Sequence, residues 1–418
     1  MLGLGRIGAR FDLHVLSHPD DIAHILDRNS ANYQNAGLLR SRYITLFGPC
    51  VLAAEGQDWH KRRKLEAPAF SRARLNSIAT RVIEETEVTA ARWEQRLKSG
   101  HATFDVVPDM SDLTLRVAGR MLLGTDFEAA LGHLESGRQV AFRDMNAVWL
   151  QENLPLVNRI PTPRRRRFAR ARATIEASMI TIIERRRERL AAGQTENDLL
   201  DILLNARDAE GIGWTDQEIA GEMHAVARAG QDTTTSSVIW AMLMIAQHPA
   251  AEARLHAELQ EVLGGQAPTA ADLPRLPYLR AIYDESLRLY PPIPTVARTA
   301  EHDDCVRGHR IPKGGFVILP AWLTHRDPRW WPEPDTFDPT RFLNGANKAG
   351  RPKYAYFPFG GGTRFCLGAG LALLQGPLIL ATLSQKYRLR VAADLKIHPR
   401  GAITILPDGG LPATIERR

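Results

Sequence analysis

The stretch "FPFGGGTRFCLGAG", residues 357–370, surrounds Cys366 with five glycines, three phenylalanines and an arginine. The run "GLALLQGPLILATL" at residues 370–383 predicts a helix, so Cys366 falls just before a helix N-terminus. A thiolate is favoured there by free backbone N–H groups and the helix dipole, and glycines let further amides approach the sulfur. An inert buried cysteine explains neither the arginine nor the glycine density. The stretch therefore predicts that Cys366 is a metal ligand.

The sequence offers few other soft ligands for such a metal. Cys50 and Cys305 lie far from Cys366 and from each other, so there is no CxxC pair, zinc-type spacing or disulfide ladder. This pattern indicates a reducing compartment. A single cysteine ligand points to a metal whose other ligands come from a macrocycle. Arg364 suits a carboxylate such as a haem propionate, and the neighbouring phenylalanines could keep water from the metal.

Helical periodicity dominates the first 290 residues. The chain has 418 residues, 44% of them apolar, and can bury a large core. Apolar residues at three- and four-residue spacing predict helices at residues 76–97, 169–190, 215–247, 249–264 and 277–290. From Pro291 onward the sequence is rich in Pro and Gly, with short β-like runs such as "GGFVILP" and "AITIL". We predict a mainly α fold with a minor β part, one domain over residues 1–418 with a helix-rich body (about 56–290) and a β- and loop-rich part (about 291–418).

The predicted helix at 215–247 has an unusual centre, "AGQDTTTSS" at residues 229–237. Six successive residues from 232 to 237 are poor helix formers, and Ser and Thr hydroxyls can bond to a carbonyl one turn back and bend a helix. An acid beside an alcohol could hold water and pass protons. The alternative is a buried helix with small residues where another helix crosses closely.

Several function classes lack support in the sequence. The "GLGRIG" at residues 3–8 fits a dinucleotide-binding fingerprint, but only two residues precede it where a strand is required. The net charge of +7 favours acidic partners, yet no nucleic-acid-binding motif accompanies it. No apolar run of 18 residues and no signal peptide occur, so we expect a cytoplasmic protein.

The spacing Phe359-x-x-Gly362-x-Arg364-x-Cys366-x-Gly368 resembles the haem-binding signature of the cytochrome P450 family. Four further motifs occur in that family's order. They are "WHKRR" (Trp59, Arg63), "AGQDTT" (residues 229–234), "ESLR" with "FDPTRF" (Glu285, Arg288, Arg341) and "PPIPTVAR" (Arg298). The resemblance runs from about residue 10 to the C-terminus.

The resemblance implies the cytochrome P450 fold, with a long central helix over haem b and the cysteine loop before the last helix. Cys366 would be the axial thiolate on the iron. The implied cofactor-binding residues are Trp59, His60, Arg63, Arg298, Phe359, Gly360, Arg364, Cys366 and Gly368, although a solvated role for His60 is equally open. Asp232 and Thr233 would deliver protons to bound dioxygen. Glu285, Arg288 and Arg341 would form a structural ion network.

The implied activity is a monooxygenase that inserts one oxygen atom from O2 into an apolar, lipid- or terpenoid-like molecule. By position, the substrate would contact a loop near 34–50, the segment around 148–163, and individual side chains of Ala225, Val226, Ala229, Ile293, Val296 and Ile403. A ferredoxin or flavoprotein would supply electrons, and the basic run "HKRRK" (60–64) is either its docking site or a solvated face. The run "RRRR" (164–167) is expected to point into solvent.

Two alternatives and one departure from the family pattern accompany this interpretation. A haem-thiolate ligand binder or gas sensor is a second hypothesis, which the Asp232–Thr233 pair argues against, since a sensor needs no proton relay. A dinucleotide-dependent dehydrogenase is a third, and it leaves the cysteine loop unexplained. The N-terminal segment usual in the family is missing from the sequence, so we expect either that the chain is truncated or that this member does without that segment; an upstream membrane anchor stays open.

Overall fold

The computed structural model describes residues 12–124, 144, 148, 160, 162–196, 198–207, 211–343, 350–392, 395, 397–401 and 404–418. The chain divides into two compact units. Unit 1 comprises Met1–Gln34, Arg72–Val117 and Gly230–Arg418, and unit 2 comprises Asn35–Ser71 and Ala118–Ala229. Among the described residues, no helix combines the length and apolarity that crossing a membrane requires.

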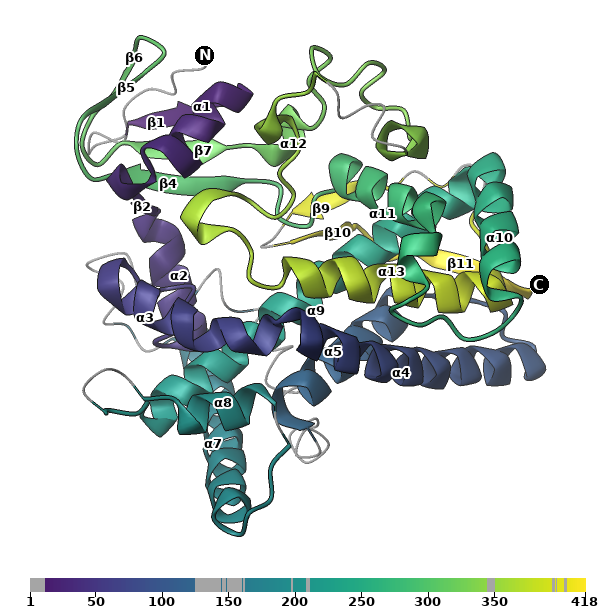
Figure 1. Ribbon diagram of the computed structural model, residues 1–418, viewed down its shortest axis with the longest axis horizontal. Coiled ribbons are helices and arrows are strands. Elements are labelled where there is room, and N and C mark those ends of the chain that lie inside the picture. The colour runs from purple at the N-terminus through teal and green to yellow at the C-terminus, as the bar shows by residue number, and fades with distance from the viewer. Residues whose placement is uncertain are drawn as a thin grey trace. The chain divides into compact units, whose positions relative to one another are not determined.

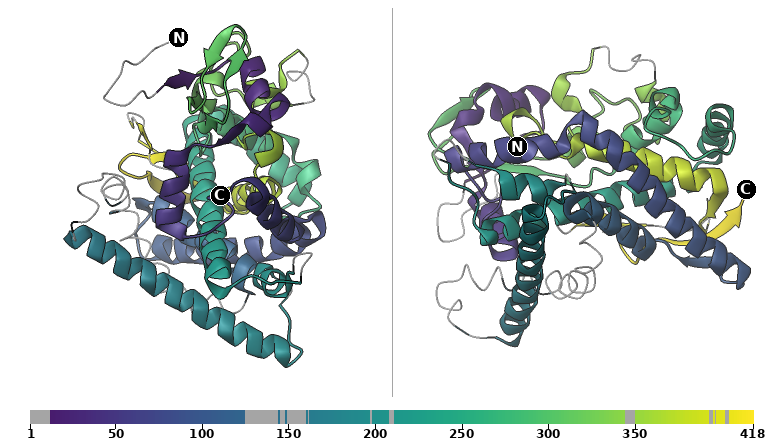
Figure 2. Two further views of the ribbon diagram at one scale, coloured as in Figure 1. Left: turned by 90° about the vertical axis from the view of Figure 1, so that its left-hand side faces the viewer. Right: turned by 60° about the horizontal axis from the view of Figure 1, so that its bottom comes forward.

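Unit 1 is built around helices α4 (Arg72–Lys98) and α13 (Ala369–Lys386), which lie side by side in Figures 1 and 2. Small residues let α13 pack closely against its neighbours. A Cβ at Gly376 would lie 2.3 Å from the Tyr283 ring of α11 (Pro277–Leu289), so this ring packs directly on the backbone of α13. The other long helices of this unit are α5 (Val107–Leu123, whose end enters unit 2) and α10 (Pro249–Leu263).

The strands of unit 1 form small sheets. A four-stranded sheet has the order β1-β7-β4-β2, in which β1 (Leu13–Val15) runs parallel to β7 (Phe316–Leu319) and β4 (Val296–Ala300) runs antiparallel to it. Its two edge strands are β1 and β2 (Tyr33–Asn35). The remaining sheets are β3-β11-β8 (Thr103–Asp105, Pro412–Arg417, Tyr387–Arg390), β10-β9 (Ile405–Pro407, Pro399–Gly401) and β5-β6 (Asp304–Val306, His309–Ile311).

An apolar cluster joins the four-stranded sheet to helix η1 (His24–Arg28) and to the first residue of the cysteine loop, Phe357. Its buried members include Ile25 and Leu26 from η1, Val317 and Leu319 from β7, and Phe357. The shorter helical elements of unit 1 are α1 (Pro19–Ala23), η2 (Ser30–Asn32), η5 (Leu273–Arg275), α12 (Ala321–Thr324), η6 (Pro339–Phe342), η7 (Lys353–Ala355) and η8 (Gly362–Arg364).

Unit 2 is helical. It contains α2 (Gly37–Phe47), α3 (Gly56–Glu66), η3 (Ala67–Phe70) and α8 (Leu199–Asn205). Figure 2 shows α7 (Pro163–Ala191) as a long straight helix. It starts with Pro163 at its first position, and the side chain of Thr162 caps it by accepting from the N–H of Arg165.

The long helix α9 (Asp216–Gln247) contributes to both units. Its start is the predicted capping box, because the N–H of Glu218 donates to the Thr215 hydroxyl and the N–H of Thr215 donates to the Glu218 carboxylate. The prediction of one helix from 215 to 247 is confirmed. The predicted mainly α fold with small sheets is confirmed as well.

One local expectation was wrong. Residues 37–47 were predicted to lie in a loop, but they form helix α2. Its start at Ala36 carries no side-chain cap, and it ends at Gly48 with φ +79°. Without a capping residue or a clear apolar stripe, its sequence gave no helix signal.

Candidate functional site

The cysteine loop, residues 357–368, is held in a tight turn that requires glycine. Gly362 has φ +66°, and a Cβ there would lie 1.6 Å from the carbonyl oxygen of Leu26. Two backbone hydrogen bonds fix the turn: Gly360 N–H donates to Phe357 O at 3.0 Å, and Cys366 N–H donates to Phe359 O at 3.1 Å. The position of Cys366 is therefore set by the backbone of the loop itself.

Cys366 is exposed and lies three residues before α13, whose N-cap is Gly368. A Cβ on Gly368 would stand 4.0 Å from the Cys366 sulfur, so the N-terminal turn of the helix lies next to the thiol. Such a location favours the thiolate form. Cys50 differs from it, because burial raises the pKa of its thiol to about 12. Cys305 is exposed and lies in strand β5.

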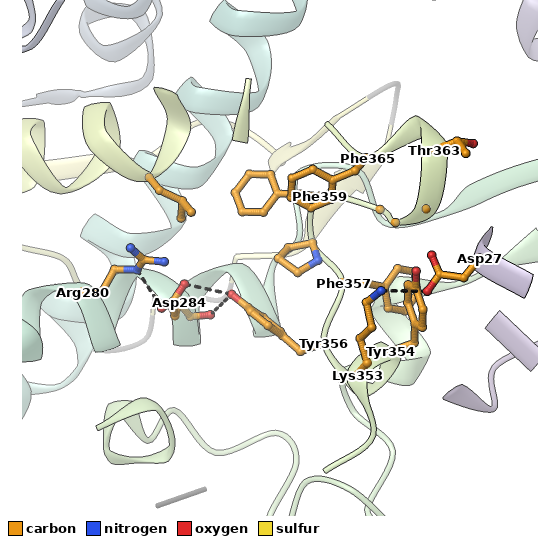
Figure 3. Close-up of a pocket in the computed structure, with 15 residues that line it drawn as sticks. Asp27, Arg280, Asp284, Lys353, Tyr354, Tyr356, Phe357, Phe359, Thr363 and Phe365 are labelled. Atoms are coloured by element: carbon orange, nitrogen blue, oxygen red, sulfur yellow. Dashed lines mark hydrogen bonds and ion pairs between the residues drawn. The ribbon is translucent and has the colours of Figure 1, made fainter. Parts of the chain in front are cut away.

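Aromatic side chains flank the loop. The rings of Phe359 and Phe365 meet edge to face with centroids 6.4 Å apart, and Phe365 is 45% exposed. Both line a cavity of about 520 Å³. Residues of α11 and of the loop stem, the segment 353–356 before the cysteine loop, line it as well. Figure 3 shows Tyr356 directed at Asp284 on one side of this cavity and Lys353 directed at Asp27 on the other. Cys366 is not among the described residues that line it, so the cavity lies beside the loop rather than at the sulfur.

The predicted propionate ligands are divided between the two units. Arg364, in η8, and Arg298, in β4, belong to unit 1 together with Cys366. Arg298 is 9% exposed, and its Nη1 donates to the carbonyl of Ala297 at 2.9 Å. A thiol at a helix N-terminus, a glycine-lined turn and guanidinium groups in one unit make a donor set that fits a haem, whose carboxylates need cations.

Helix α3, in unit 2, carries the other predicted cofactor-binding residues. Trp59 is buried and Arg63 half-buried, four residues apart and so on one face of α3, while His60 is exposed. The ring of His60 packs against Trp59 with centroids 4.8 Å apart. Arg62, in the middle of the basic run, is not part of an exposed basic surface, because it is buried and pairs with Glu218 and Glu222.

Helix α9 passes through "AGQDTTTSS" without a break. The hydroxyl of Thr235 donates to Gln231 O at 3.0 Å and lies 2.6 Å from the Thr114 hydroxyl, while Ser236 donates to Ile405 O at 2.6 Å. These buried bonds fix the rotation of the helix. Asp232 and Thr233 are half-buried, and Thr233 lies roughly 200° around the helix from Thr235, at 100° per residue.

No observation on the described residues brings the predicted substrate-contacting residues together in one place. On α9, Ala225 is fully buried, Val226 half-buried and Ala229 exposed. Ile293 and Val296 of unit 1 are half-buried. Ile403 lies outside the described residues, as does most of the segment 148–163.

Glu285, Arg288 and Arg341 lie together in unit 1. Arg288 makes two 2.7 Å contacts with the Glu285 carboxylate, and Arg341 Nε lies 3.4 Å from the same carboxylate. Burial raises the pKa of Glu285, and its hydrogen bonds to Arg288 act in the opposite direction. Reasoning from sequence missed His325, which is fully buried and contacts both Arg288 and the cysteine loop. A lone histidine in "LTHRDP" carries no pattern that could have identified it.

Comparisons with known proteins agree with this geometry. The cytochrome P450 family model matches residues 9–408. Cyclooctatin synthase of Streptomyces melanosporofaciens is 32% identical over 404 residues, covering 96% of this chain and 85% of that protein. Cyclooctat-9-en-7-ol 5-monooxygenase of the same organism is 31% identical over 380 residues, covering 90% and 80%.

Solved structures share the fold. The cytochrome P450DA haem domain superimposes with a TM-score of 0.85 at 25% identity, covering 97% of this chain and 87% of that one. The retinoic acid-bound cyanobacterial CYP120A1 has a TM-score of 0.86 at 25% identity, covering 97% and 89%. The chain belongs to the cytochrome P450 family of haem-thiolate monooxygenases, which use O2 and electrons from a redox partner to oxygenate apolar small molecules.

Proposed function

We propose that this monooxygenase binds haem b through Cys366 and hydroxylates or epoxidises an apolar, terpenoid-like molecule. The observation that carries the proposal is the exposed Cys366 thiol at the N-terminal turn of α13, in a loop whose Gly362 position admits no side chain. When bound, the haem supplies the iron that activates dioxygen. The protein's part is to bind, orient, exclude water and deliver protons.

Cys366 would hold the haem iron through its thiolate. The N-terminal dipole of α13 and the N–H groups near the sulfur favour its anionic form. Arg298 and Arg364, with Trp59, Arg63 and His60, are the proposed partners of the two propionates. Gly360 and Gly368 let the backbone approach the cofactor, and Phe359 shields the sulfur from water.

Asp232 and Thr233 are the proposed proton-delivery pair. Both side chains are half-buried, and as consecutive residues of α9 they lie about 100° apart around the helix. A carboxyl next to a hydroxyl can accept a proton from water and pass it on through the hydroxyl oxygen. In this proposal Asp232 exchanges protons with solvent. The Thr233 hydroxyl would then pass a proton toward the place where dioxygen would bind.

The proposed substrate class rests on the relatives' names and on the chemistry of the predicted contacts. The name cyclooctat-9-en-7-ol describes an unsaturated cyclic alcohol, and the other relative is named for cyclooctatin. The proposed contact residues on the described part of the chain are Ala225, Val226, Ala229, Ile293 and Val296, with Ile403 outside it. All six are aliphatic, which favours a mostly hydrocarbon ligand.

The proposed electron donor is an acidic ferredoxin or flavoprotein. The chain carries a net charge of +7, and His60, Lys61 and Lys64 are exposed on α3. A basic surface attracts an acidic partner and accelerates their association. We further propose that both units function as one cytochrome P450 domain, which the family match over residues 9–408 supports.

The first experiment is the visible spectrum of the purified, reduced protein with and without carbon monoxide. A long-wavelength Soret band of the carbonyl complex is expected for thiolate ligation, and Cys366→Ser is expected to abolish it. Cys305→Ser is the matched control, because Cys305 is also exposed but lies in strand β5. Retention of the band in Cys366→Ser would overturn the assignment of the ligand.

A further inference from the structure

We propose that His325 is a positioning residue for Cys366, because its ring ties the start of the cysteine loop to helix α11. The inference rests on the proposed function, in which Cys366 is the thiolate ligand. His325 directly follows α12, and its own N–H donates to Ala321 O at 2.8 Å. Its side chain is fully buried.

Both ring nitrogens of His325 have backbone partners. Nε2 lies 2.9 Å from the N–H of Phe357, and since an amide N–H only donates, Nε2 accepts. The proton of a neutral ring is then on Nδ1, which lies 3.3 Å from the carbonyl oxygen of Arg288 and donates to it. The ring therefore bridges the Arg288 carbonyl of α11 and the Phe357 amide of the cysteine loop. Only the Nδ1–H tautomer satisfies both hydrogen bonds.

The surroundings of His325 keep the ring neutral. Burial, followed by the positive charge of Arg288, lowers the pKa of His325 to about 3, and Arg326 acts in the same direction. The rings of Tyr356 and Phe357 pack against it at 5.2 and 5.3 Å. A charged ring would have no acceptor for the Phe357 amide, so neutrality and the contact require each other.

The contact reaches Cys366 through a short path in the backbone. The Phe357 carbonyl accepts the N–H of Gly360 at 3.0 Å, and the Phe359 carbonyl accepts the N–H of Cys366 at 3.1 Å. Fixing the Phe357 peptide therefore fixes the base of the turn that carries the sulfur. This is the role that outer hydrogen-bond partners play in orienting a metal ligand.

The same histidine closes a loop of hydrogen bonds with the buried ion pair. Arg288 Nη1 donates to the carbonyl of His325 at 2.9 Å, while the His325 ring donates to the carbonyl of Arg288. The Glu285–Arg288 pair and the cysteine loop are thus joined through one residue. Two other hydrogen bonds hold the loop stem without involving the Phe357 amide. Trp331 Nε1 donates to Ala355 O at 3.1 Å, and Tyr356 Oη donates to Asp284 O at 3.0 Å.

The test compares His325→Phe, His325→Gln and Tyr356→Phe as haem-loaded proteins at a temperature where each is folded. We expect His325→Phe to raise the fraction of reduced carbonyl complex in the thiol form roughly tenfold over wild type. His325→Gln, which can still accept and donate, should recover most of the thiolate form. Tyr356→Phe removes a stem anchor that does not touch the Phe357 amide, and its spectrum should match wild type.

Each outcome has one interpretation. A His325→Phe protein with the wild-type thiolate fraction would overturn the inference, while wild type itself lacking the long-wavelength band would instead overturn the proposed function. If Tyr356→Phe raised the thiol fraction equally, His325 would contribute only to the general stability of this region, and the inference would also be overturned.

Wild-type protein provides a test that needs no folded Phe variant. In the carbonyl complex labelled with ¹⁵N-histidine, the His325 signal, assigned by its loss in His325→Gln, should show a protonated Nδ1 and an unprotonated Nε2 down to pH 5. A protonated Nε2 in that range would contradict the hydrogen bond from Phe357 and with it the proposal.

Discussion

Glu285 and Arg288 form a two-point ion pair one turn apart on α11, with 2.7 Å from Nε to Oε2 and 2.7 Å from Nη2 to Oε1. Neither side chain is exposed. The rest of the Arg288 guanidinium donates to the carbonyls of His325, Pro334 and Thr336. The pair therefore fastens α11 to the chain between α12 and η6 rather than acting in the chemistry.

Arg288→Ala should destabilise the holoprotein by about 3–5 kcal/mol, because it leaves a buried carboxylate without its partner. Arg288→Lys should recover little, since an ammonium cannot reproduce both the fork to Glu285 and the three carbonyl contacts. The measurement is the free energy of unfolding in urea. The matched control is Arg280→Ala on the same helix, where the half-exposed pair with Asp284 contributes about 1 kcal/mol or less. Equal losses in both alanine variants would contradict the structural role of Arg288.

The turn of the cysteine loop allows a comparison between two glycines. Gly360 (φ +70°) has open space where a Cβ would be, whereas a Cβ at Gly362 (φ +66°) would meet the backbone oxygen of Leu26. Gly360→Ala should cost about 1–2 kcal/mol from the left-handed backbone alone. Gly362→Ala should cost at least about 1–3 kcal/mol more and displace the loop, because backbone cannot move aside as a side chain can.

Thermal unfolding and the carbonyl spectrum of both glycine variants measure the two effects. The Gly362 variant should lose more stability and more thiolate ligation than the Gly360 variant, because only the Gly362 Cβ meets backbone of the protein itself. If both variants lose the same stability and retain the thiolate band, the close approach to Leu26 does not constrain the loop.

Much of the fold could be predicted from periodicity and caps. The capping box at Thr215 and Glu218 and the apolar stripe predicted the whole of α9, and the predicted α13 start differs from the observed one by a single residue. The start of α7 was placed six residues late, because the arginines after Pro163 conceal the apolar face. Helix α2 was missed for want of a cap.

The candidate site was less predictable than the fold. Cys366 was indicated by local sequence, since glycine, arginine and a following helix are all within a few residues of it. The contact between His325 and Phe357 could not be predicted, because it depends on how α11, α12 and the loop stem come together across the chain. No residue pattern marks a histidine whose partners are all backbone groups.

Thr233→Ala should uncouple electron consumption from product formation and release peroxide, because it removes the proposed proton donor. The matched control is Thr235→Ala on the same helix, whose buried hydroxyl bonds to Thr114 and Gln231. Thr235→Ala should cost about 1–3 kcal/mol of stability by leaving Thr114 without this partner, with coupling unchanged. Peroxide and product are measured per electron pair consumed. Peroxide release equal to wild type in Thr233→Ala would remove Thr233 from the relay.

A buried carboxyl in unit 2 should make stability depend on pH. Glu66 of α3 is fully buried, and the buried Glu222 of α9 is held by Arg62 Nη1 at 3.1 Å and by the N–H of Val51 at 2.9 Å. Burial, reinforced by the charge of Glu222, raises the pKa of Glu66 to about 10. Glu66 therefore keeps its proton at neutral pH.

The sign of the effect follows from proton linkage. A carboxyl whose pKa is higher in the folded state than in the unfolded state binds more protons when folded, so stability falls as the pH rises from about 4.5 toward 10. Glu66→Gln cannot ionise and should escape this loss. Its advantage over wild type should be near zero at pH 5 and reach an order of 1–3 kcal/mol at pH 8.5, since one pKa unit corresponds to about 1.4 kcal/mol. Urea unfolding at both pH values measures this, with the exposed Glu84→Gln on α4 as the control that should show no such trend. A difference between Glu66→Gln and wild type that is the same at both pH values would mean that Glu66 is ionised in the folded protein, and that Arg62 compensates two buried carboxylates rather than one.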